Sequence, residues 1–261
     1  MGNTAVTLQA LGNSEEAAQM QRQVLEAQKA NAGTEHPHTL TTMGNLALAL
    51  EGLGKLQEAA GMLRQQLEAR ERVLGHEHPD TLTTRGNLAG YLCFLGNLEE
   101  AAQMHSQVLE GQVRVLGNEH HDTLTIRGNL AETLRALGKL EEAAQMERQL
   151  LEAQERVLGN EHIDTLTTRS DLAKILHALG NVEEAAQMQR QVLEAQEEML
   201  GHEHPDTLTT RSNLAEHPNT RISKGRLVVW ERQGKLEEAA PMQRLIIKAG
   251  ALGSTKTHVE D

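Results

Sequence analysis

The residues best suited to chemistry in this sequence are histidines that recur in short polar segments. They stand in the pairs His76/His78, His120/His121 and His202/His204. Two imidazoles in one loop could begin a zinc site, but a closed site needs about four ligands and a catalytic site about three. The chain has one cysteine, Cys93, and the glutamate of the same segment recurs just as regularly. We therefore interpret the histidines as loop-packing and helix-capping residues, and we predict neither a metal nor any other cofactor.

Glutamate pairs such as Glu99/Glu100 and Glu141/Glu142 could supply acid–base chemistry, but they also recur. Each pair falls in the first turn of an expected helix, where carboxylates interact favourably with the helix dipole. The sequence has no Gly-x-Ser-x-Gly nucleophile turn and no His-Glu-x-x-His zinc motif. We therefore expect no enzyme activity.

Arginine forms a third recurring group, at Arg85, Arg127, Arg169 and Arg211. A ladder of guanidinium groups could grip the carboxylates or phosphates of a ligand. The interpretation we favour is that the aliphatic stems pack between helices while the guanidinium groups pair with neighbouring glutamates.

All these groups recur because the sequence repeats every 42 residues. A Leu-Gly pair followed by an acidic Ala-Ala segment begins at Leu11, Leu53, Leu95, Leu137 and Leu179, and a Gly-(His/Asn)-Glu-His segment begins at Gly75, Gly117, Gly159 and Gly201. A period of this length predicts a solenoid of helical units, each of which buries its apolar surface only against its neighbours.

Each period contains two helical patterns. The first runs from about Thr81 to Leu95, with Asp80 or Thr81 as its N-cap and Gly96 ending it in a left-handed conformation. The second starts at Asn97, which is expected to form a capping box with Glu100. We predict that its buried stripe comprises Leu98, Ala101, Met104, Val108, Val115 and Leu116.

These patterns predict an all-α fold, a right-handed superhelical solenoid of antiparallel helix pairs with a 42-residue period. Residues 1–38 are expected to be a truncated first repeat, and residues 39–216 the regular array, with four complete repeats and the start of a fifth. Residues 217–250 are interpreted as a degenerate terminal repeat with an insertion, and residues 251–261 as a tail. The irregular ends suggest part of a longer array or of a larger assembly.

Charge and composition limit the expected partners. The net charge is −12 without a Lys/Arg-rich run, which disfavours nucleic-acid phosphates and anionic lipid surfaces. A single cysteine fits a reducing compartment, and the sequence shows neither a signal-peptide pattern nor an apolar run long enough for a membrane span. We therefore expect a cytoplasmic protein that binds no nucleic acid and does not insert into membranes.

One segment carries a family resemblance. Asn129–His162 contains Leu-Gly-Lys-Leu-Glu-Glu-Ala-Ala, then Arg-Gln-Leu-Leu-Glu-Ala-Gln-Glu-Arg-Val-Leu-Gly-Asn-Glu-His, and it resembles the 42-residue tetratricopeptide repeats of kinesin light chains. The resemblance implies helix pairs whose first helices line a concave groove that binds protein partners. This chain has Leu92 where the family usually has an aromatic residue, and Gly86 where it often has asparagine.

Transferred to this sequence, the resemblance places Gly86, Gly90, Cys93 and Phe94 in the groove, together with their equivalents in the following repeats. Asparagines at Asn45, Asn87 and Asn129 would bond the backbone of a bound peptide, or else would only bond the adjacent repeat. Arg135, Lys174 and His177 form a local basic spot in an acidic protein, and they suggest a partner with an acidic segment. The predicted peptide-binding residues are Asn87, Phe94, Asn129, Arg135, Lys174 and His177.

The predicted function is therefore a non-catalytic scaffold or adaptor that binds a partner peptide in this groove. The alternative is a sensor or regulatory arm of a larger nucleotide-binding switch protein. An enzyme with a metal on the histidine loops, and a truncated copy without a selected function, are two further hypotheses.

Overall fold

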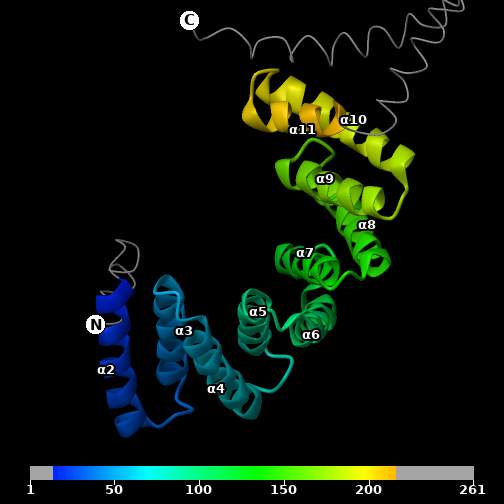
Figure 1. Ribbon diagram of the computed structural model, residues 1–261. Coiled ribbons are helices and arrows are strands. Elements are labelled where there is room, and N and C mark those ends of the chain that lie inside the picture. The colour runs from blue at the N-terminus through cyan, green and yellow to red at the C-terminus, as the bar shows by residue number, and fades with distance from the viewer. Residues whose placement is uncertain (1–13, 216–261) are drawn as a thin grey trace, which may run out of the picture. The chain divides into compact units, whose positions relative to one another are not determined.

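The computed structural model describes residues 14–215, and every regular element in that range is an α-helix (Figure 1). The predictions for the residues before 14 and after 215 lie outside the described residues. The helices are α2 (Ser14–Ala32), α3 (Pro37–Gly52), α4 (Leu56–Leu74), α5 (Pro79–Phe94), α6 (Leu98–Leu116), α7 (His121–Ala136), α8 (Leu140–Val157), α9 (Ile163–Ala178), α10 (Val182–Leu200) and α11 (Pro205–Ala215).

The predicted alternation of two helices per period is confirmed. The first helices of successive repeats start at Pro37, Pro79, His121, Ile163 and Pro205, and the second helices start at Ser14, Leu56, Leu98, Leu140 and Val182. Neighbouring starts within each series are 42 residues apart, as the repeated sequence strings require.

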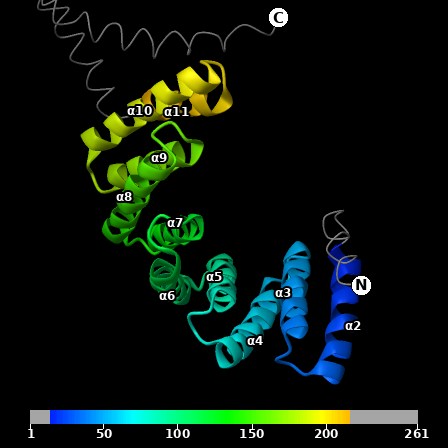
Figure 2. The ribbon, with the colours of Figure 1, turned by 180° about the vertical axis from the view of Figure 1, so that it is seen from behind.

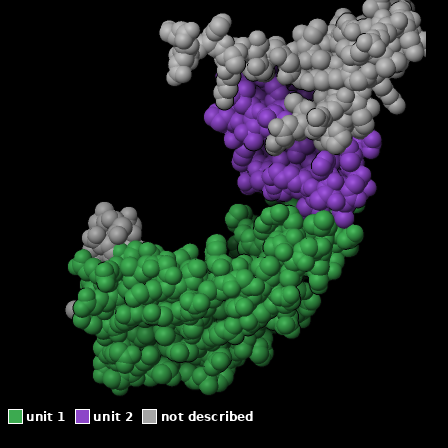
Figure 3. All heavy atoms as spheres, viewed as in Figure 1, with its two compact units in different colours: residues 1–157 green, residues 158–261 purple. Residues whose placement is uncertain are grey.

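The chain divides into two compact units, residues 1–157 and residues 158–261 (Figure 3). The first contains α2 to α8 and the second contains α9 to α11. Inside each unit, every helix packs against the helices before and after it in the sequence, as both views of the ribbon show (Figures 1 and 2). Each unit is therefore a stack in which helices contact mainly their sequence neighbours.

The core between the helices is aliphatic and rich in alanine. Ala59, Ala101 and Ala143 occupy one repeat position near the start of each second helix, and all three are completely buried. Leu88 and Leu92 of α5 lie in the same core. The predicted stripe of α6 is wrong at its end, because Val115 and Leu116 are 48% and 38% exposed.

The first helices are capped by histidine, not by Asp80 or Thr81. His78 precedes α5 in an extended conformation, and its Nδ1 accepts a hydrogen bond from the backbone N–H of Asp80 at 3.2 Å. His36, His120, His162 and His204 make the same bond in their repeats. The bond satisfies one of the unpaired N–H groups of the first turn, so the capping interpretation of the loop histidines is confirmed.

The capping box at the second helices is wrong. Asn97 precedes α6 with ψ of 60°, outside the extended region that an N-cap side chain needs, and its side chain makes no capping bond. Its backbone N–H instead donates to the carbonyl of Leu92, closing the end of α5. Gly96 stands between them with φ of +80°, as predicted, and lysine replaces the asparagine at Lys55 and Lys139.

The core position Leu88 tests how much of the stability lies in these helix contacts. We expect Leu88→Ala to reduce the free energy of unfolding by about 2–5 kcal/mol, because it leaves a cavity between closely packed helices. Leu116→Ala removes the same atoms from an exposed site and should cost less than about 1 kcal/mol. Urea unfolding followed by circular dichroism measures both, and equal losses for the two variants would contradict this account of the core.

Candidate functional site

The main candidate site is a groove on the first unit, with a volume of about 450 Å³. It lies mainly along the first helices α3 and α5, and α4 and α7 also contribute to its wall. The lining residues are Thr41, Gly44, Asn45, Ala47, Leu48, Glu51, Leu63, Gln66, Arg70, Thr84, Gly86, Asn87, Gly90, Tyr91, Phe94 and Asn129. This is a mixed surface of amides, hydroxyls and aliphatic groups with few charges.

Three asparagines line the groove at one repeat position, one on each described first helix of the first unit. They are Asn45 on α3, Asn87 on α5 and Asn129 on α7. Asn87 and Asn129 are exposed and Asn45 is half-buried. Among residues 14–215, none is hydrogen-bonded to these three side-chain amides. Residues 14–215 therefore contain no hydrogen bond that would support the hypothesis that these asparagines only bond the adjacent repeat.

A tyrosine–carboxylate pair, which the sequence analysis missed, joins two repeats inside the groove. The Tyr91 hydroxyl of α5 donates to Glu51 Oε2 of α3 at 2.7 Å. Burial, followed by this bond and the charge of Glu51, raises the pKa of Tyr91 above its usual value. The two residues are 40 positions apart, and the only signal for the pair was that Tyr91 is the single tyrosine of the chain.

The apolar part of the groove is unusually open. Leu48 is 47% exposed and Phe94 is 74% exposed. A phenylalanine is more often found in a core than on a surface, and large exposed apolar side chains beside polar groups are typical of binding sites. Phe94 therefore offers an aromatic contact to a ligand in the groove.

The structure brings together three of the six predicted peptide-binding residues. Asn87, Phe94 and Asn129 line the groove, as do Gly86 and Gly90. Cys93 does not line it; this residue is half-buried, with its Sγ 3.4 Å from Thr133 Oγ1.

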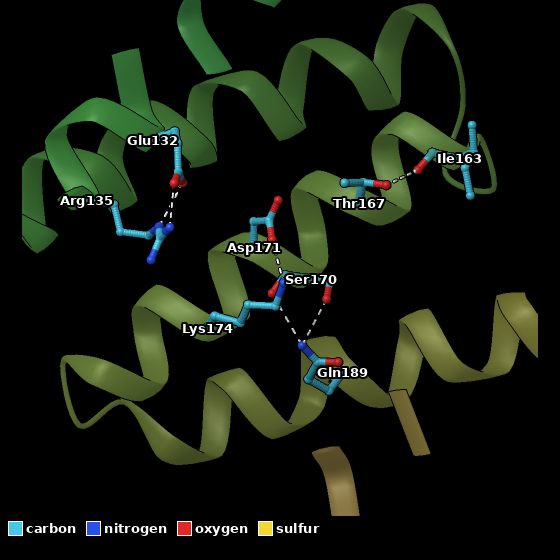
Figure 4. Close-up of polar contacts among 8 residues, drawn as sticks. All are labelled: Glu132, Arg135, Ile163, Thr167, Ser170, Asp171, Lys174 and Gln189. Carbon is cyan, nitrogen blue, oxygen red and sulfur yellow. Dashed lines mark hydrogen bonds and ion pairs between the residues drawn. The ribbon is translucent and has the colours of Figure 1, made fainter. Parts of the chain in front are cut away.

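The remaining three predicted residues lie elsewhere. Arg135, on α7, is outside the groove lining, and Lys174 and His177 belong to the second unit, on α9. Arg135 contacts Glu132 through two hydrogen bonds of 2.7 and 2.5 Å, and Lys174 contacts Asp171 at 2.7 Å (Figure 4). Arg135 and Lys174 thus each have a carboxylate one turn away on the same helix, which offsets the charge of each.

Comparison with known proteins identifies the architecture. Family models described as tetratricopeptide repeat match residues 1–72, 61–112, 86–156 and 165–206. The chain belongs to the tetratricopeptide repeat family. Members of this class are protein-interaction scaffolds, and that is the general role of this chain.

Solved structures refine the assignment to kinesin light chain-like repeats, as the sequence resemblance predicted. Tetratricopeptide-like, nearly identical repeats of a Podosopora anserina protein described as a kinesin light chain are 30% identical, with a TM-score of 0.70. That match covers 76% of this chain and 93% of the other. BtubC (BKLC) from P. vanneervenii, at 18% identity and a TM-score of 0.60, covers 95% of this chain and 92% of its own, and it shows the fold alone. No match was found among curated proteins.

Two further features of this tetratricopeptide array bear on its chemistry. Within residues 14–215, no group of three or more His, Cys, Asp and Glu side chains is placed to hold a metal ion. No helix of this range is both long and apolar enough to cross a membrane.

The recurring arginines are structural. Arg85 is nearly buried and its Nη2 donates to Glu71 Oε1 at 2.5 Å, while Arg211 pairs in the same way with Glu197. Burial alone would raise the pKa of Glu197, but the hydrogen bonds and charges of Arg211 and His202 lower this pKa below its usual value. Arg127 has Val113 at the equivalent position and donates instead to Asn118 Oδ1 at 3.1 Å. The prediction was that the aliphatic part of each arginine packs between helices and that its guanidinium group pairs with a nearby glutamate. Arg85 and Arg211 pair in this way, whereas Arg127 pairs with an asparagine amide.

One buried histidine connects α6 to α7. His105 of α6 is almost fully buried, and its Nδ1 lies 3.1 Å from the Thr133 hydroxyl, which itself donates to the carbonyl of Asn129. Because that hydroxyl proton is already used, the bond requires a proton on Nδ1 of a neutral ring. Burial lowers the pKa of His105 to about 4, and no described residue bonds its Nε2.

His105 makes the stability of this protein sensitive to acid. Its pKa lies near 6.5 in the unfolded chain and about 4 in the folded chain, so the unfolded state binds more protons between those values. We expect stability to fall as the pH drops from about 6.5 to about 4, with a contribution from this ring of roughly 3 kcal/mol. His105→Gln, which installs the residue found at Gln21 and Gln189, should remove that contribution. Urea midpoints at several pH values test this, and an identical pH dependence in both proteins would contradict it.

Proposed function

We propose that this protein binds a partner peptide in the groove of its first unit, and that it acts as a non-catalytic adaptor. The observation that carries the proposal is the row of three asparagines that line the groove, two of them exposed and one half-buried, whose side-chain amides make no bond to any described residue. An amide side chain both donates and accepts. A row of amides at one repeat position can therefore bond N–H and C=O groups at intervals along an extended chain without selecting its side chains.

The apolar groups of the groove would supply anchoring contacts. Phe94 and Leu48 expose large apolar surfaces beside the asparagines. Covering them with an apolar side chain of the ligand removes both surfaces from water. The volume of about 450 Å³ is within the range of small-ligand and side-chain pockets.

An acidic segment in the partner is the finer part of the proposal, and it rests on Arg135 in the first unit and, separately, on Lys174 and His177 in the second. Arg135 and Lys174 already contact Glu132 and Asp171. A partner carboxylate would therefore have to exchange with a carboxylate of the same helix. Such exposed pairs contribute about 0–1 kcal/mol, so the exchange is possible at small cost.

Peptides selected from a random display library against the whole 261-residue chain would test the groove directly. We expect Phe94→Ala and Asn87→Ala each to weaken binding of a selected peptide by about 1–2 kcal/mol, roughly five- to thirtyfold, because each removes a contact in the groove. Gln103→Ala, an exposed position on the second helix α6, is the matched control and should bind as the wild type does. Peptides that bind all four proteins equally would place the interface elsewhere.

The acidic segment has a separate test in the pair Glu132 and Arg135. For a selected peptide with an acidic stretch, Arg135→Glu should weaken binding about tenfold, whereas Glu132→Gln should strengthen it by a few fold, because it removes the competing carboxylate. Titration at low and high salt measures both effects. Unchanged affinity in both variants would remove the acidic segment from the proposal and leave the asparagine groove untouched.

A further inference from the structure

One arginine of helix α4 lines the groove and has no carboxylate partner in the described part of the chain. This residue, Arg70, is half-buried, and no described residue forms an ion pair with it. The other two arginines of α4, Arg64 and Arg72, are exposed, and they pair with Glu100 at 2.8 Å and with Glu35 at 3.1 Å. Because a half-buried charge without a counter-charge is costly, an anionic group of a ligand would bind favourably at Arg70.

Hydrogen bonds hold the Arg70 side chain in place and leave one edge of its guanidinium group unused. Its Nη1 donates to the carbonyl oxygen of Asp80 and to Thr84 Oγ1, each at 2.7 Å, near the start of α5. These bonds use both N–H groups of Nη1, whereas those of Nε and Nη2 bond no residue of the described part. Nε and Nη2 form an edge of the kind that binds a carboxylate through parallel hydrogen bonds. The site is therefore fixed in position and suited to a carboxylate.

The fold of the repeat does not require a cation at this position. The equivalent residues of the other repeats are all glutamines, namely Gln28, Gln112, Gln154 and Gln196. Nor does Arg70 adjoin the start of the described range. It bonds the beginning of α5, whereas Ser14 lies beside Gly52 at the end of α3. The charge of Arg70 is therefore a feature of this groove and not of the repeat.

A carboxylate lines the same groove farther along the first helices. Glu51 lies in the last turn of α3 and accepts a hydrogen bond from the Tyr91 hydroxyl at 2.7 Å. Tyr91 comes about two turns after Thr84, which corresponds to roughly 10 Å along α5. An extended peptide covers this length in about three residues. A short extended segment can therefore reach both charges of the groove.

We propose that Arg70 binds one carboxylate side chain of the partner peptide, and that Glu51 excludes a second carboxylate about three residues away. This inference rests on the proposed function, because it assigns the chemistry of a peptide in that groove. The groove then selects a segment with a single Asp or Glu, a neutral or cationic residue near Glu51 and an apolar side chain at Phe94. The charges fix the register of the segment, while the amides and the apolar contacts hold it. The site is separate from Arg135, which lies outside the groove lining.

Peptides selected from the display library on the wild-type chain provide the probes. Those whose binding is weakened by both Phe94→Ala and Asn87→Ala are the groove-dependent peptides. We expect each to contain an Asp or Glu whose replacement by Asn or Gln weakens binding to wild type about tenfold. A second carboxylate placed about three residues from the first, on the side that meets Glu51, should weaken binding severalfold. Glu51→Gln retains an acceptor for the Tyr91 hydroxyl and should remove that penalty.

The variant Arg70→Gln separates the charge of Arg70 from its place in the fold, because it installs the residue of the equivalent positions. It should weaken binding of the acidic form of a groove-dependent peptide about tenfold, while the amide form should bind wild type and variant within about twofold. Arg64→Gln removes the same charge from an exposed position of α4 outside the groove lining, and it should bind both forms as wild type does. Circular dichroism and urea unfolding check that each variant is folded.

The outcomes distinguish this inference from the function on which it rests. Groove-dependent peptides that bind Arg70→Gln as tightly as wild type would overturn the inference and leave the peptide groove in place. Equal losses for the acidic and the amide forms would show that Arg70 only supports the fold, and equal losses in Arg64→Gln would assign the effect to net charge; either result would also overturn it. If no selected peptide depends on Phe94 and Asn87, the proposed function itself is wrong, and the role of Arg70 is rejected with it.

Discussion

The structure depends on helices that approach one another closely enough for alanine to fill the space between them. Ala59, Ala101 and Ala143 are completely buried at one repeat position. With 1% aromatic residues, the chain has few large side chains that could build a central core. Burial is therefore spread over contacts between successive helices, and each repeat is stable only because the next one covers it. Small residues therefore recur at the same positions in each 42-residue period, because every junction between helices needs them.

The same constraint decides how much of the fold could be predicted from the sequence. Helix number, helix type and spacing follow from one repeat, because they depend on local periodicity. The identity of the capping residues does not follow from the repeat. Several residues near a helix start can accept a hydrogen bond, and the backbone conformation determines which of them does. His78 is extended and caps α5, whereas Asn97 has its backbone committed to the end of the preceding helix. Val115 and Leu116 continue the helical pattern of α6, yet their burial would require a neighbour at that level of the stack.

The candidate site was predictable where it repeats and unpredictable where it does not. Asn87, Asn129 and Phe94 could be placed because their positions relative to Gly96 and its equivalents fix the face of a first helix. The bond from Tyr91 to Glu51 crosses between repeats and depends on two residues that the other repeats lack. The recurring arginines show the same division. Their repeat position buries both Arg85 and Arg127. Arg85 pairs with Glu71, whereas Arg127 pairs with Asn118, because the residue equivalent to Glu71 in its repeat is Val113. Burial without a carboxylate is what lowers the pKa of Arg127.

Charge distribution indicates how a ligand would be selected. The net charge of −12 repels an acidic ligand at long range, and the contacts of Arg135 and Lys174 with carboxylates weaken the local attraction. The groove itself presents three neutral amides, an aromatic ring and the Tyr91–Glu51 pair. Electrostatic steering is therefore a minor source of affinity, and hydrogen bonding to the ligand backbone with apolar anchoring must provide most of it. A site built in this way favours chain conformation and the placement of one apolar side chain over net charge, which suits an adaptor that recognises a short segment of a larger partner.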